Sequence, residues 1–108
     1  MTSYTELRLL PWPGPDGKPC FLSTDDAGGY LSRLADSTEA IQLGLSIELL
    51  DHAREVLADA DTDPDELRLL AAELTGALRD AVRVATSRGR RLPIPVHSAP
   101  AGLSAHFR

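Results

Sequence analysis

The four residues DPDE at positions 63–66 constrain the fold most, because they separate two long stretches of helical periodicity. Asp63 can accept hydrogen bonds from the free amides of a first helical turn, and Pro64 suits the first helical position. The acids in this segment also favour the positive end of a helix dipole. The segment therefore predicts a helix over residues 64–87, with Gly89 as its C-terminal cap. Its expected inward-facing residues recur every three or four positions: Leu67, Leu70, Leu74, Leu78, Ala81 and Ala85.

The preceding residues 36–60 predict another helix, and the sequence DSTE at its start has the form of a capping box. One apolar stripe, expected to face inward, contains Ile41, Leu45, Leu49, Ala53, Val56 and Ala60. A second stripe on a neighbouring face contains Leu43, Ile47, Leu50 and Leu57. Because one partner helix cannot cover both stripes, the second stripe is a candidate dimer face. The short connection between the two helices predicts that they pack antiparallel.

Residues 4–34 predict short strands and tight turns. Segment 4–12 contains residues that favour strands, and segment 20–24 has the character of a returning strand. Between them, the Asp-Gly pair at positions 16–17 suits a tight hairpin turn, while nearby prolines restrict the strands to sheet edges. Residues 30–34 could form a third strand of a meander or lead into the following helix, and we favour the strand.

Composition limits the chain to one core. Of its 108 residues, 43% are hydrophobic and only 5% aromatic, so the core must consist mainly of aliphatic side chains. We predict an α+β fold, mostly α, in which a small N-terminal antiparallel β-hairpin or meander packs on a two-helix antiparallel hairpin. Residues 1–92 are expected to form the single globular domain, and residues 93–108 an extended, flexible, Pro-containing tail.

No arrangement of residues in the sequence predicts catalysis. Cys20 is the only cysteine, and nothing in the sequence pairs it with His52, His97 or His106. The chain contains no G-x-S-x-G nucleophile motif and no C-x-x-C or H-E-x-x-H metal motif. We therefore expect a non-enzymatic protein without cofactor or metal, in which Cys20 is a small core residue.

Two loops share only part of the pattern of a ligand-binding motif. The loop GPDGK at 14–18 places glycines before a lysine, but Pro19 stands where a phosphate-binding loop needs Ser or Thr. The alternating acids of residues 59–65 lack the glycine and the twelfth-position acid of a calcium loop, and a proline interrupts them. A hairpin turn and a solvated interhelical loop are the better interpretations.

Charge is distributed unevenly. The formal net charge is −5, with twelve acids and four bases in residues 1–63 and four acids and seven bases in residues 64–108. An acidic chain without aromatic residues among its clustered arginines at 79–91 disfavours nucleic-acid binding. Candidate contacts for an acidic partner or another anion are Arg79, Arg83, Arg88, Arg90, Arg91 and the separate aromatic Trp12. Cations are also favoured at helix C-termini, and Arg79 or Arg83 could pair with acids of the other helix.

Three segments carry a resemblance to known sequences: PWPGPDGKPCFLST at 11–24, GGYLSRLAD at 28–36 and ALRDAVRVATSRGRRLP at 77–93. Over roughly residues 6–93, the chain resembles small actinobacterial proteins of a type associated with genes for helix-turn-helix regulators and signalling proteins. The resemblance attaches no catalytic residue to any position. It implies an accessory or regulatory protein rather than a metabolic enzyme.

We expect a non-enzymatic regulatory or adaptor protein that binds another protein and forms a homodimer. One alternative is a small-ligand or nucleotide-binding module, with a pocket walled by Trp12, Phe21 and Tyr30 and supplied with a cation by Arg33. The other is a nucleic-acid-binding accessory protein that uses the arginines at the end of the second predicted helix.

The N-terminal residues lack the basic start and apolar run of a signal peptide, and no apolar stretch approaches the roughly 18 residues of a membrane span. We therefore expect a cytoplasmic protein without a membrane partner.

Overall fold

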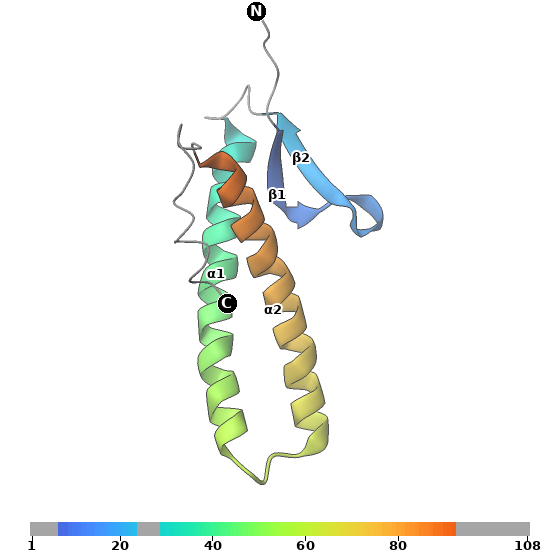
Figure 1. The fold of residues 1–108 in the computed structure, drawn as a ribbon, viewed down its shortest axis with the longest axis vertical. Helices are drawn as coiled ribbons and strands as arrows, with labels where there is room; N and C mark the ends of the chain where they lie inside the picture. The colour runs from blue at the N-terminus through green and yellow to red at the C-terminus, as the bar shows by residue number, and fades with distance from the viewer. Residues whose placement is uncertain (1–6, 24–28, 93–108) are drawn as a thin grey trace, which may run out of the picture.

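A computed structural model of the chain describes residues 7–23 and 29–92. Its elements are strand β1 (Leu7–Pro13), the 3₁₀ turn η1 (Pro15–Gly17), strand β2 (Pro19–Ser23), helix α1 (Tyr30–Ala58) and helix α2 (Pro64–Arg91). The two helices form a long antiparallel hairpin, and the strands form a two-stranded antiparallel hairpin beside one end of it (Figure 1). The predicted α+β, mostly helical class is confirmed. The predicted tail at 93–108 lies outside the described residues.

The β-hairpin turns where the Asp-Gly pair predicts it. Asp16 and Gly17 have φ angles of 60° and 76°, and the Gly14 amide donates to the Lys18 carbonyl at 2.7 Å. The strands pair in register from Leu7 opposite Ser23 to Pro13 opposite Pro19, with an irregularity between Leu9 and Pro13. Pro11 lies within this irregular stretch and has no amide to donate to a ladder. Residues 4–6 and 24 of the predicted strands lie outside the described residues.

β1 is the inner strand, and helix side chains replace a third strand along its free edge. Residues Arg8–Pro11 of β1 are buried, and the strand packs mainly against α2. The Ser87 hydroxyl donates to the Leu9 carbonyl at 2.7 Å. The Pro11 carbonyl accepts from Arg83 Nη1 at 3.1 Å and from Gln42 Nε2 at 2.9 Å. These bonds satisfy carbonyls that an added strand would otherwise pair with, so this edge of the sheet is closed.

α1 begins earlier than the sequence predicts. Its first residue is Tyr30 and its N-cap is Gly29, so the strand favoured for residues 30–34 is wrong. The capping-box interpretation of Asp36 and Glu39 is wrong for the same reason, because both lie inside the helix. Their carboxylates form long-range ion pairs with Arg8 of β1, at 2.7 and 3.3 Å. The two acids that form a capping-box pattern in the sequence therefore make a tertiary contact with β1 instead.

α2 begins as predicted and ends later. The Asp63 carboxylate accepts from the Asp65 amide at 3.0 Å, and Pro64 is the first helical residue. The helix continues through Gly89, which is not its cap, and ends at Arg91. Leu92 adopts the extended backbone that a residue before a proline favours. The helix therefore ends two residues before Pro93 rather than at Gly89.

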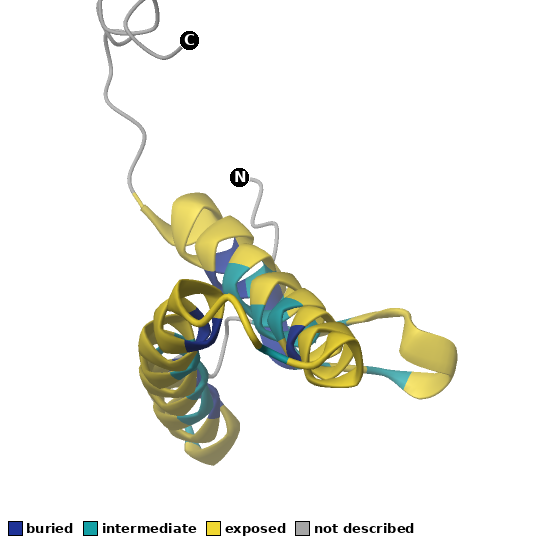
Figure 2. Cartoon of the chain, turned by 90° about the horizontal axis from the view of Figure 1, so that it is seen from below, coloured by how far each residue is buried: buried dark blue, intermediate teal, exposed yellow. Residues whose placement is uncertain are grey.

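The helices share a small apolar core toward the loop that joins them. Ala53, Val56 and Leu70 are buried there, with Leu49 and Leu74 packed against them. Burial follows the facing sides of the helices, while the loop end and the outer surfaces are exposed (Figure 2). No helix among the described residues is long and apolar enough to cross a membrane.

The inward stripe predicted for α1 is wrong in its first half and at Ala60, which is exposed and follows the end of the helix at Ala58. Ile41 and Leu45 are 61% and 59% exposed. The inner positions at the strand end carry small and polar residues instead, spaced in the same three-and-four pattern as the core below: Ser32, Ala35, Glu39, Gln42 and Ser46. Ser32, Glu39 and Gln42 of this row contact β1, and Glu39 also pairs with arginines of α2. The apolar side chains of that half of α1 therefore point outward. On α2, Leu67, Leu78 and Ala85 of the predicted inward stripe are likewise exposed.

Replacing Ser87 with alanine is expected to lower the free energy of unfolding by about 1–3 kcal/mol, because the buried Leu9 carbonyl loses its donor. Urea unfolding followed by circular dichroism measures this loss. The matched control is Thr75→Ala, whose exposed hydroxyl bonds only to the Ala71 carbonyl of its own helix. Its expected change lies within about 0.5 kcal/mol. Equal losses of stability in the two variants would contradict the role of Ser87 as the hydrogen-bond donor to the Leu9 carbonyl of β1.

Candidate protein-interaction surface

A buried carboxylate holds the strand end of the molecule together. Glu39 of α1 is 1% exposed and lies among three arginines from two other elements. Its Oε2 lies 3.3 Å from Arg8 Nη2, and its Oε1 lies 3.2 Å from both Arg88 Nε and Arg91 Nη2. We call Glu39, Arg8, Arg88 and Arg91 the Glu39 cluster. It joins β1, α1 and α2 through side chains of opposite charge.

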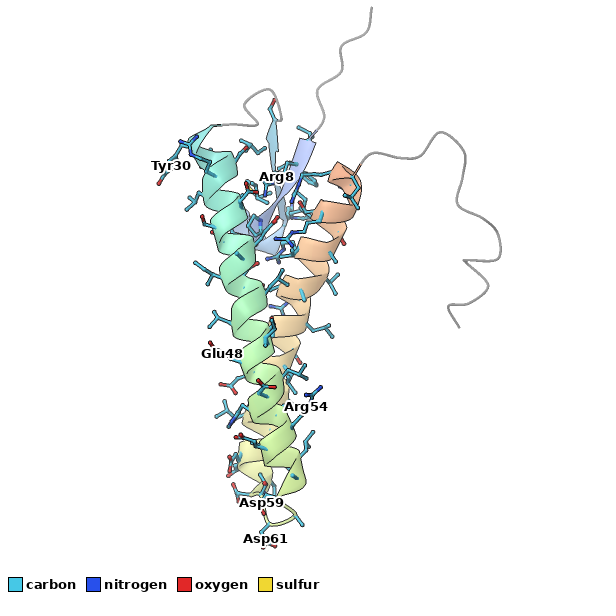
Figure 3. The ribbon with its side chains drawn as sticks, turned by 90° about the vertical axis from the view of Figure 1, so that its left-hand side faces the viewer. Arg8, Tyr30, Glu48, Arg54, Asp59 and Asp61 are labelled. Atoms are coloured by element: carbon cyan, nitrogen blue, oxygen red, sulfur yellow. The ribbon has the colours of Figure 1, made fainter. Side chains whose placement is uncertain are left out.

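Further bonds fix the arginines of the Glu39 cluster. Arg8, which lies between the two helices in Figure 3, also donates to the Ser32 carbonyl at 3.2 Å and to Asp36 at 2.7 Å. Arg91 donates to the Ser87 hydroxyl as well. Removing one partner from a buried ion pair leaves an uncompensated charge in a medium of low polarity, which is costly. The cluster therefore specifies one way of assembling the three elements.

The charge of Glu39 is testable with a substitution that keeps its shape. Glu39→Gln is expected to lower the free energy of unfolding by about 3 kcal/mol, because the buried Arg8 then keeps only the exposed Asp36 as its counter-charge. Asp36→Asn is the control, since Asp36 pairs with the same Arg8 but its side chain is 65% exposed. Its expected loss is below about 1 kcal/mol. Chemical denaturation measures both, and a Glu39→Gln variant as stable as Asp36→Asn would refute the cluster's role.

The structure separates the predicted cationic contacts into two groups. Arg88 and Arg91 belong to the Glu39 cluster, and Arg83 binds the Pro11 carbonyl and lies 3.6 Å from Asp80. Arg79 and Arg90 are exposed, and no hydrogen bond or ion pair is recorded for them within the described part of the chain. Three of the five arginines predicted to bind an anion therefore bind groups within the chain. Glu39 of α1 is the carboxylate that pairs with two of them.

The aromatic residues of the predicted ligand pocket belong to three different elements. Trp12 is half-buried on β1, Phe21 is 42% exposed on β2, and Tyr30 is the first residue of α1. The apolar groove that the structure does show lies elsewhere, between the two helices. Within residues 7–23 and 29–92, no group of three or more His, Cys, Asp or Glu side chains is placed to hold a metal ion.

That groove is the centre of a broad apolar surface. It is shallow and open, and it is lined by Ser46, Leu50, Leu74, Ala77, Leu78 and Ala81. The predicted dimer stripe borders it on α1, where Leu43 is half-buried and Ile47, Leu50 and Leu57 are exposed. We call the following residues the open face: Leu43, Ile47, Leu50 and Leu57 of α1 with Leu67, Leu74, Leu78 and Ala81 of α2. Ile47 is 63% and Leu78 65% exposed.

The open face and the β-hairpin occupy different sides of α2. Ser87 and Arg83 face β1, whereas Ala81 and Leu78 lie about 120–180° around the helix from them at 100° per residue. The β-hairpin therefore leaves this surface uncovered. Along α2 the row is formed by positions 67, 71, 74, 78, 81 and 85, and none of them is charged. In the corresponding row of α1, the only charged side chain from Leu43 to Leu57 is Arg54.

Compared with known proteins, the chain matches no protein-family model, no curated protein and no solved structure. The function of the chain is therefore inferred from its own geometry. Sequence reasoning missed Glu39 as a buried residue, although a signal for it exists. The inward row Leu49, Ala53 and Val56 continues toward the N-terminus at the same spacing through Glu39, which marks Glu39 as an inner position.

Proposed function

We propose that this protein is a non-enzymatic regulatory or adaptor protein of the cytoplasm, which acts through protein–protein contacts as a homodimer. The observation that carries the proposal is the open face, where exposed leucine and isoleucine side chains of both helices border one apolar groove. Contiguous exposed apolar surface of this kind is typical of protein-binding sites.

Packing on the open face would complete a core that one chain leaves thin. Within the described part of the chain, the buried apolar cluster between the helices consists of Ala53, Val56 and Leu70. Two such hairpins facing one another form the arrangement of a four-helix bundle, in which the apolar rows of four helices share one core. The predicted dimer stripe lies at this surface, which supports the homodimer as the working form.

A charge placed in the open face is expected to dissociate the homodimer. Ile47→Glu would bury a carboxylate among apolar side chains, so sedimentation of the variant at micromolar concentration should give a monomer of 11.6 kDa. Leu45→Glu is the matched control, because Leu45 is exposed to nearly the same extent but points to the opposite side of α1. This control is expected to remain dimeric.

A monomeric unmodified protein in the same measurement would overturn the homodimer. Dissociation by Leu45→Glu with Ile47→Glu unaffected would instead place the interface on the outer side of α1. No observation in the described structure favours the nucleotide-binding alternative, whose aromatic residues Trp12, Phe21 and Tyr30 lie on three different elements. None favours the nucleic-acid-binding alternative either, since Arg88 and Arg91 are engaged by Glu39.

A further inference from the structure

We propose that residues 93–108, which we call the C-terminal segment, lie across the open face of their own chain, and that a second copy must displace them before the homodimer forms. The open face is the surface of the proposed homodimer, so this regulation rests on the proposed function. The C-terminal segment is thereby the group that covers the open face in a single copy.

The C-terminal segment begins on the same side of α2 as the open face. The uncharged row of α2 runs through Leu78 and Ala85, and Leu92 follows Ala85 after seven residues. Seven residues at 100° each return to within about 20° of the same side of a helix. Leu92 is 66% exposed, and its backbone is already extended. The chain therefore leaves α2 at the end of the row that borders the groove.

The C-terminal segment is long enough to cover the face. Leu78, which lines the groove, lies about 21 Å from Leu92 along the helix axis, at a rise of 1.5 Å per residue. An extended chain of about 15 residues spans about 50 Å, so the first half of the segment reaches the groove and the rest can lie along it. Because the segment is tethered to the hairpin, its effective concentration at the open face is on the order of millimolar. That exceeds the concentration of a second copy in a micromolar solution.

The composition of the C-terminal segment matches the open face. Residues 93–107 contain no Asp, Glu, Lys or Arg, whereas 25% of the residues in the whole chain are charged. Segments that stay solvated are typically rich in charge and poor in large apolar side chains. Here apolar side chains recur at every second position, at Ile94 and Val96 and again at Leu103, Ala105 and Phe107. In an extended chain this alternation produces one apolar side, which suits an uncharged apolar groove.

The C-terminal segment and a second copy compete for the same surface. Two open faces can meet only after each copy has released its own segment. If the segment covers the face about two-thirds of the time, about one-third of each face is free, and the Kd of the homodimer rises about tenfold because two free faces are needed. The segment therefore sets the concentration at which the homodimer forms.

Substitutions in the full chain test this competition. Leu103→Asp places a carboxylate on the apolar side of the C-terminal segment, so the segment is expected to leave the open face and the Kd of the homodimer to fall about tenfold. Ser104→Asp is the matched control, because it adds the same charge one residue along, on the opposite side of an extended chain. Its expected change in Kd is less than about twofold. Sedimentation over a series of concentrations measures both.

The outcomes separate this regulation from the homodimer itself. Equal dissociation constants for Leu103→Asp and Ser104→Asp would contradict the competition and leave the homodimer intact. A weaker homodimer of Leu103→Asp would make the C-terminal segment part of the dimer interface, which also contradicts the competition. Monomers at every concentration, in the unmodified protein and both variants, would overturn the homodimer and its displacement of the segment.

A nitroxide label locates the C-terminal segment without relying on the dimer. Ser104→Cys in a Cys20→Ser background gives the chain one labelled position. Paramagnetic broadening of amide NMR signals is expected at Leu50 and Leu78, which line the groove, but not at Leu22 of β2, which lies on the other side of α2. An isotope-labelled chain without nitroxide, mixed with a nitroxide-labelled chain without the isotope, should show no such broadening. Broadening in that mixture would place the segment on the partner's face, and its absence at the groove in the doubly labelled chain would place the segment elsewhere; either result overturns the inference.

Discussion

The rest of the structure depends on a buried negative charge at Glu39. Its carboxylate pairs with Arg8 of β1 and with Arg88 and Arg91 of α2. This one side chain therefore connects α1 to both β1 and α2. A carboxylate removed from water is tolerated only when opposite charges and donors surround it. The strand and both helix ends must therefore meet at one place, and this requirement defines how the β-hairpin docks.

The same polar cluster determines where the apolar surface lies. Because Glu39 and Gln42 occupy inner positions of α1, the leucines and isoleucines of that region cannot also face inward. The apolar cluster between the two helices lies toward the loop end, where it consists of Ala53, Val56 and Leu70. At the strand end, the buried apolar side chains are those that pack around β1: Leu9, Leu10, Ala35 and Val84. What remains is a long hairpin with uncovered apolar rows, and a surface of that kind is better suited to receiving another protein than to enclosing a small molecule.

Local signals predicted the elements whose ends are set by nearby residues. The Asp63-Pro64 start of α2 and the Asp-Gly turn of the β-hairpin are confirmed, because capping and turn geometry depend on neighbours in the chain. Predictions failed where a distant group competed. Asp36 and Glu39 bind Arg8 instead of capping a helix, and Gly89 lies inside α2 because the helix continues until the residue before Pro93. The spacing of the sequence predicted that the stripe of Leu43, Ile47, Leu50 and Leu57 lies apart from the inward face of α1, whereas the α2 half of the open face required the structure.

The sequence by itself determined the class of fold, two helices of helical periodicity joined at a capped loop after a proline-rich hairpin. Periodicity, caps and turns are short-range properties, so they can be read along the chain. Only the tertiary structure decided that Glu39 is buried, that three of the five predicted arginine contacts are engaged internally, and that the open face combines both helices. Those outcomes depend on residues far apart in sequence competing for one interior, and ion pairs across 49 or 52 positions leave no local pattern.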